Sequence, residues 1–164
     1  MPAANGPWWR GTRGEGFVAV QAGLTALVIL GPRHWAAGPS WAWTARPWSL
    51  ACGLPLMAAG ALLLAASLVR LGANLSPLPH PKAGAELVAT GPYRLVRHPI
   101  YSGAMLLAFG WAVLVRGGLT CASAALLAVF FEIKARREER WLAATFPDYP
   151  AYQRRVRKFI PFVY

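Results

Sequence analysis

A chain of 164 residues is long enough for one domain and too short for separate cofactor and substrate domains. Its apolar fraction of 56% exceeds that of a typical soluble domain, and its 17 lysines and arginines, which give a net charge of +11, stand at the ends of apolar runs. A nucleic-acid binder would carry these bases on a soluble scaffold, so we expect no nucleic-acid partner and predict an integral membrane protein. Cys52 and Cys121 lie inside apolar runs and offer neither metal-ligand spacing nor a disulfide framework.

The first apolar run covers residues 17–30 and follows Arg10 and Arg13. A signal peptide has a similar pattern, but no clear small-residue cleavage site follows, and we interpret the run as a retained span. Because it falls short of the roughly 20 residues that cross a bilayer, it must use flanking residues or a thin region of membrane. The next connection carries four tryptophans, which predict a belt at the headgroup level: Trp35, Trp41, Trp43 and Trp48.

Three further apolar runs follow, over residues 48–71, 100–115 and 119–133. Gly53 and Gly60 in the first of these suit close contact between helices. Residues 72–99 are polar and contain five prolines from Pro77 onward, which exclude a continuous helix there. The turn at residues 116–118 is so short that the last two runs must be antiparallel neighbours.

The distribution of basic residues predicts the orientation of these runs. With four spans, 14 of the 17 lysines and arginines fall on one side, and only Arg33, Arg46 and Arg116 fall on the other. Basic residues gather on the cytosolic side of membrane proteins. We therefore predict an all-α integral membrane fold with about four transmembrane helices and both termini in the cytosol.

The polar segment 91–103 interrupts the apolar runs and reads Gly-Pro-Tyr-Arg-Leu-Val-Arg-His-Pro-Ile-Tyr-Ser-Gly. It holds two arginines, a histidine and two tyrosines, and such groups are costly next to a membrane. We interpret it as a functional segment. The alternative is a basic loop that only connects two helices.

Half of the acidic residues stand at or beyond the end of the fourth run: Glu132, Glu138 and Glu139. An ordinary helical pair of Glu132 with Arg136 is one interpretation, and a carboxylate that faces the segment 91–103 is the other. Residues 149–162 then alternate aromatic and basic side chains. This pattern predicts an amphipathic helical tail that lies at the interface with its bases on anionic lipid headgroups.

Together, the segment 91–103 and the Glu138-Glu139-Arg-Trp-Leu sequence resemble the isoprenylcysteine carboxyl methyltransferase and phospholipid methyltransferase group of integral membrane enzymes. The resemblance covers about residues 70–164. It extends into the tail through Phe146, Tyr149, Tyr152, Val156, Ile160 and Pro161. One departure is Phe146-Pro147-Asp148, where the family usually has Phe-Gly.

Length and the apolar runs predict a single membrane domain over residues 1–164 with a two-span region at 1–71, and the resemblance implies a cofactor-binding catalytic region at 72–164. It implies methyl transfer from S-adenosylmethionine at the cytosolic surface of a membrane, the inner membrane in a bacterium, to a lipid-like or prenylcysteine-type acceptor from the bilayer. The residues implied for the cofactor are Tyr93, His98, Pro99, Tyr101, Gly103, Glu138 and Glu139. Those implied for catalysis are Arg97, His98 and Glu138, and those for the substrate are Arg94 and Arg97.

These residue types suit the chemistry. A glutamate can accept hydrogen bonds from the ammonium or ribose of the cofactor, and His98 and Tyr101 can donate to its acceptor groups. A carboxylate acceptor needs no general base and would be anchored by Arg94 or Arg97. An amine acceptor must lose a proton, which makes His98 or a glutamate a candidate base.

Two other functions fit parts of the pattern. Sterol reductases resemble the same C-terminal region but use a nicotinamide cofactor, and they are larger proteins with more spans. A small membrane protein without enzymatic activity would keep the segment 91–103 as a structural loop. The sequence sets neither the methyl acceptor nor an oligomeric state.

Overall fold

The computed structural model describes residues 15–34, 46–75, 84 and 86–164. These residues form helices and no β-strand, which confirms the expected all-α fold, and one isolated parallel bridge joins Val96 to Arg157. The α-helices are α1 (Glu15–Leu30), α2 (Arg46–Leu71), α3 (Pro99–Leu114), α4 (Gly118–Thr145) and α5 (Tyr149–Arg155). Two short 3₁₀ helices are η2 (Gly72–Asn74) and η3 (Gly91–Arg94).

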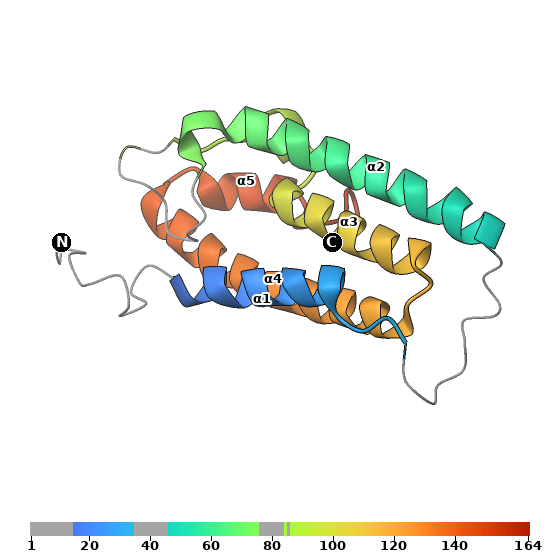
Figure 1. The fold of residues 1–164 in the computed structure, drawn as a ribbon. Helices are drawn as coiled ribbons and strands as arrows, with labels where there is room; N and C mark the ends of the chain where they lie inside the picture. Colours follow the sequence, from blue (N-terminus) through green and yellow to red (C-terminus); the bar gives the residue numbers. More distant parts are fainter. Residues whose placement is uncertain (1–14, 35–45, 76–83, 85) are drawn as a thin grey trace.

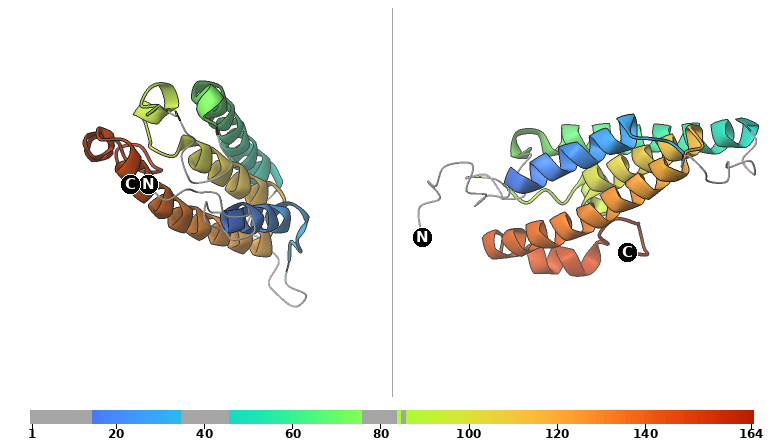
Figure 2. Two further views of the ribbon diagram at one scale, coloured as in Figure 1. Left: turned by 90° about the vertical axis from the view of Figure 1, so that its left-hand side faces the viewer. Right: turned by 60° about the horizontal axis from the view of Figure 1, so that its bottom comes forward.

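The four long helices lie roughly side by side in the order α2, α3, α4, α1, with α5 against the end of α4 (Figure 1). The end-on view in Figure 2 shows α3 between α2 on one side and α4 on the other. The start of α1, the end of α2, the start of α3 and the charged end of α4 all lie at one end of this bundle. The segment that holds the candidate site residues therefore meets the C-terminal part of the chain there.

Glycines set the contact between α2 and α3. A Cβ on Gly60 would lie 2.8 Å from the carbonyl oxygen of Gly103, and one on Gly53 would lie 3.0 Å from that of Gly110. Gly53 and Gly60 are seven residues apart in α2, as are Gly103 and Gly110 in α3, so the two glycines of each helix lie on the same face. The two backbones approach so closely because neither helix carries a side chain at these positions.

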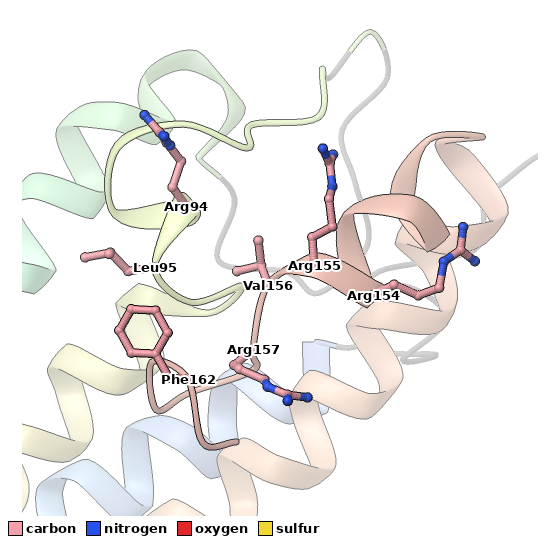
Figure 3. A pocket seen from close by; sticks show the side chains of 7 residues that line it. All are labelled: Arg94, Leu95, Arg154, Arg155, Val156, Arg157 and Phe162. Carbon is pink, nitrogen blue, oxygen red and sulfur yellow. The ribbon is translucent and has the colours of Figure 1, made fainter.

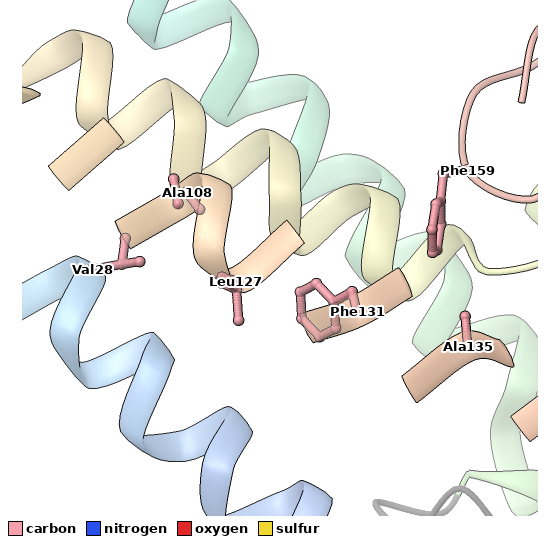
Figure 4. Packing of buried hydrophobic residues seen from close by; sticks show 7 residues of the cluster. Val28, Ala108, Leu127, Phe131, Ala135 and Phe159 are labelled. Atoms are coloured by element: carbon pink, nitrogen blue, oxygen red, sulfur yellow. The ribbon is translucent and has the colours of Figure 1, made fainter. Parts of the chain in front are cut away.

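A cluster of buried apolar side chains holds α4 against α1, α3 and the tail. Figure 4 shows Leu127 of α4 near Val28 of α1 and Ala108 of α3, Phe131 further along α4, and Phe159 of the tail at the far end. Outside this cluster the helices keep many large apolar side chains exposed, including Leu30, Leu62 and Val69 at more than 70%. A helical bundle with so little of its apolar surface covered is typical of proteins that face lipid.

Two helices of the described part of the chain, α2 (together with η2) and α4, are long and apolar enough to cross a membrane. The expected second run, residues 48–71, lies within α2, whereas α1 and α3 have 16 residues each and span about 24 Å at the usual rise of about 1.5 Å per residue. At 28 residues, α4 exceeds the roughly 30 Å hydrocarbon core by more than 10 Å. Its charged part therefore extends beyond the apolar run.

The predicted helical tail is wrong in its extent. Only residues 149–155 form a helix, since residues 156–158 instead run beside residues 96–98 and pair with their backbone. Tyr149 and Tyr152 are buried against the rest of the protein. Of the predicted tryptophan belt, Trp35, Trp41 and Trp43 lie outside the described residues, as do residues 76–83 and 85 of the proline-rich loop.

Candidate active site

Two prolines shape the segment that carries most of the candidate residues. Pro92 stands in the first turn of η3 and Pro99 in the first turn of α3, where a missing N–H costs nothing. Residues 95–98, between η3 and α3, are not helical, and the N–H groups of Arg97 and His98 donate to the carbonyls of Arg157 and Lys158 at 2.8 and 3.1 Å. The tail thus fixes the backbone from which both side chains project.

Arg97 makes an ion pair with Glu139 that is buried on both sides. Its Nη2 lies 2.7 Å and its Nε 2.8 Å from Oε1 of Glu139, and each side chain is 9% exposed. The remaining Nη1 donates to the backbone carbonyls of Gln153 and Val156. Gln153 also donates from its side chain to Oε2 of Glu139 at 3.2 Å. This network joins the segment 91–103 to α4 and α5.

His98 lies between the two neighbouring glutamates. Its Nε2 is 3.2 Å from Oε1 of Glu139, and its Nδ1 is 3.8 Å from Oε2 of Glu138. Tyr101, one turn further along α3, donates its hydroxyl to the same oxygen of Glu138 at 2.7 Å. Glu138 is the more accessible of the two carboxylates, with a side chain 25% exposed.

Aromatic rings hold these polar groups in place. The rings of His98 and Tyr101 stack with centroids 5.3 Å apart, and Tyr101 in turn stacks on Phe131 at 4.8 Å. On the side of the site that faces α1, the ammonium of Lys134 lies 5.3 Å from the centre of the Tyr101 ring and donates to the amide oxygen of Gln21 at 2.5 Å. Through Gln21, α1 also contacts the site.

Three buried tyrosines line the side of the site that η3 and α5 form. Tyr152 donates its hydroxyl to the carbonyl of Tyr93 at 2.6 Å. Burial raises the pKa of Tyr152 to about 12, and burial together with the charge of Glu138 raises the pKa of Tyr93. Tyr149 is 1% exposed, its hydroxyl has no partner among the described residues, and burial raises its pKa. All three hydroxyls therefore stay protonated at neutral pH.

The structure brings five of the predicted site residues into one cluster, which we call the carboxylate cluster: Arg97, His98, Tyr101, Glu138 and Glu139. Tyr93 and the buried Pro99 lie beside it in the chain and support the backbone. Gly103 faces α2, which gives it a packing role, and its contact with a cofactor stays a prediction. Arg94 is exposed and lies apart from the cluster, where it helps to line a separate cavity.

Several neighbours of the cluster were not among the predicted site residues: Gln21, Lys134, Tyr149 and Gln153. Gln21 and Lys134 are 113 residues apart, so no spacing pattern could have paired them. The interpretation of Glu132 as an ordinary helical pair with Arg136 is confirmed. Glu132 also pairs with Lys158 and accepts from the hydroxyl of Tyr164, both in the tail. Within the described part of the chain, no three histidine, cysteine or acidic side chains are grouped to hold a metal ion.

Comparison with known proteins finds relatives that match part of the chain. The cobalt-zinc-cadmium resistance protein CzcN of Cupriavidus metallidurans is 36% identical over 76 residues, which cover 46% of this chain and 35% of that protein. The nickel-cobalt-cadmium resistance protein NccN of Alcaligenes xylosoxydans xylosoxydans is 32% identical over 81 residues, which cover 49% of this chain and 38% of that protein. The match therefore spans little more than a third of the length of each relative.

A sequence profile of a whole family gives the longer match. The family described as phospholipid methyltransferase matches residues 48–149, which make up more than half of the chain. The matched range runs from the start of α2 to the first residue of α5 and includes every member of the carboxylate cluster. The chain therefore belongs to the phospholipid methyltransferase family of membrane methyltransferases.

Proposed function

We propose that this protein transfers the methyl group of S-adenosylmethionine to a lipid-like acceptor at the cytosolic surface of a membrane, the inner membrane in a bacterium. The observation that carries the proposal is the carboxylate cluster, because it joins the two segments that resemble methyltransferases across about 40 residues of chain. Membership of the family makes methyl transfer the reaction to expect.

The residues around the cluster fit the cofactor chemically. Glu138 keeps an accessible carboxylate that can accept from an ammonium or from ribose hydroxyls. The buried hydroxyl of Tyr149 has no hydrogen-bond partner among the residues that the structure describes and can serve a polar ligand. Bound there, S-adenosylmethionine would supply an activated methyl group. Glu139 is already saturated by Arg97, His98 and Gln153, so we assign it to holding the site together.

In this proposal the protein acts mainly by positioning. In-line transfer between a sulfonium and an acceptor needs near-contact geometry more than acid–base help. Should the acceptor be an amine, Glu138 would take its proton directly or through His98, whose Nδ1 faces it at 3.8 Å. Because Arg97 already uses all three of its nitrogens, it is no longer our candidate anchor for a carboxylate acceptor.

We also propose that α1, α2, α3 and α4 all cross the membrane, with both termini in the cytosol. The four helices lie side by side, and Arg33, Arg46 and Arg116 stand at the end of the bundle opposite the carboxylate cluster. This distribution follows the positive-inside rule. The short helices α1 and α3 would then cross with help from flanking residues or local thinning of the bilayer.

The proposal is tested by calorimetric titration of the purified protein in uncharged detergent with S-adenosylmethionine and, separately, with NADPH. We expect the first to bind and the second not to. Glu138→Gln should weaken binding of S-adenosylmethionine about tenfold, or about 1.4 kcal/mol. The exposed Glu86→Gln is a matched control that should leave affinity unchanged. Binding of NADPH alone would replace our proposal with a reductase, and binding of neither would remove both.

The acceptor is identified by a second assay. The protein is incubated with S-adenosylmethionine labelled in its methyl group, together with a total lipid extract or a panel of prenylcysteines. We expect label in one lipid-like product, and chemical hydrolysis then distinguishes a methyl ester from a methylated amine. Label in neither pool, from protein that binds the cofactor, would contradict a lipid-like acceptor.

A further inference from the structure

A basic cavity lies on the exposed side of the segment 91–103, away from the carboxylate cluster. Its volume of about 330 Å³ is within the range of small-molecule sites. Figure 3 shows the side chains that line it: Arg94, Leu95, Arg154, Arg155, Val156, Arg157 and Phe162. Four of the seven are arginines and none is acidic.

These arginines differ from Arg97 in their partners. The ion pairs of the described residues involve Arg97, His98, Arg136 and Lys158, and they include none of the four guanidinium groups at the cavity. Arg94 from η3 and Arg155 from the end of α5 extend in the same direction on the two sides of the cavity, and Arg154 and Arg157 add positive charge nearby (Figure 3). Several guanidinium groups without a carboxylate favour a multivalent oxyanion, above all a phosphate.

The apolar part of the cavity indicates where that phosphate comes from. Leu95 and Phe162 line it and are 53% and 88% exposed. The neighbouring Ile160 and Val163 are also exposed apolar side chains of the same turn. An apolar, solvent-exposed turn next to arginines matches the layered chemistry of a bilayer surface, with acyl chains below the phosphates.

We propose that this cavity binds the phosphate group of a membrane phospholipid, with Arg94 and Arg155 on the phosphate oxygens and the lipid chains beside Leu95 and Phe162. A backbone hydrogen bond connects this cavity to the carboxylate cluster, because the N–H of Arg97 in the cluster donates to the carbonyl of Arg157 at the cavity. A lipid bound there holds the tail in place from outside. The proposal concerns lipid binding alone and does not depend on methyl transfer.

Native mass spectrometry of the protein in uncharged detergent tests this site without any cofactor present. The probes are phosphatidylglycerol, diacylglycerol, which lacks the phosphate, and inorganic phosphate. We expect phosphatidylglycerol to bind at least about tenfold more tightly than either of the others, since only it has both the phosphate and the chains. Equal binding of diacylglycerol would overturn the role of the phosphate. Equal binding of inorganic phosphate would overturn the lipid as its source.

Paired variants locate the site. Arg94→Gln with Arg155→Gln should weaken phosphatidylglycerol binding about tenfold or more, because two charge-assisted contacts are lost. Arg137→Gln with Arg140→Gln removes the same charge from the exposed face of α4 and should leave binding near that of the unmodified protein. An equal loss in both pairs would show a general charge effect and overturn the site. If the first pair lowers the melting temperature, each single variant is measured instead and should still bind more weakly.

Discussion

The two sides of α3 achieve close packing by opposite means. Toward α2, Gly103 and Gly110 present bare backbone, and the contact depends on the absence of side chains. At the end of α3 that faces α4 and the tail, His98 and Tyr101 present polar rings, and the contact depends on each polar group finding its partner. Added side-chain atoms should therefore destabilise the contact with α2, whereas loss of a polar group should destabilise the contact with α4 and the tail.

The largest loss should follow from Glu139→Ala. This change leaves the buried guanidinium of Arg97 without its carboxylate, and breaking a buried pair on one side costs about 3–5 kcal/mol. Chemical denaturation in detergent measures the free energy of unfolding. A double change to methionine at Arg97 and Glu139 should lose less than Glu139→Ala, because no unpaired charge remains. A double variant as unstable as the single one would contradict this view of the pair.

A smaller loss is expected on the glycine side, where Gly60→Ala adds a single methyl group. That atom would lie 2.8 Å from the backbone of Gly103 and Leu107, and overpacking of this kind costs about 1–3 kcal/mol. Gly23→Ala in α1 is the matched control, because a Cβ there meets nothing within 4 Å. It should leave stability unchanged or raise it by up to about 1 kcal/mol. Equal effects of the two changes would mean that α2 and α3 are not in close contact.

The sequence predicted well what depends on composition and on short spacing. The apolar runs predicted the helices, the close-packing role of Gly53 and Gly60 is confirmed, and so is the turn between α3 and α4. The grouping of the segment 91–103 with the two glutamates also followed, because Arg97, His98 and Tyr101 resemble a known family pattern.

The sequence could not predict contacts that depend on how distant segments meet. Alternating aromatic and basic residues suggested a helix throughout the tail, but residues 156–158 gain backbone hydrogen bonds from the non-helical residues 97 and 98. The same pairing turns Arg97 toward Glu139 and leaves Arg94 exposed, although both arginines stood in one segment as equal candidates for the substrate. Tertiary partners decided between them.

The smallest and most selective effect should come from Tyr149→Phe. Its hydroxyl is buried and has no partner in the described part of the chain, so its removal should cost no stability and should raise the free energy of unfolding by up to about 1 kcal/mol, because a buried hydroxyl without a hydrogen bond is destabilising. Binding of S-adenosylmethionine should nevertheless weaken about fivefold, since we assign this hydroxyl to the cofactor. Tyr152→Phe is the matched control, because it removes the bond to the carbonyl of Tyr93 and should cost about 1 kcal/mol of stability. Calorimetric titration and denaturation of both variants separate the two roles, and an unchanged affinity in Tyr149→Phe would place the cofactor away from α5.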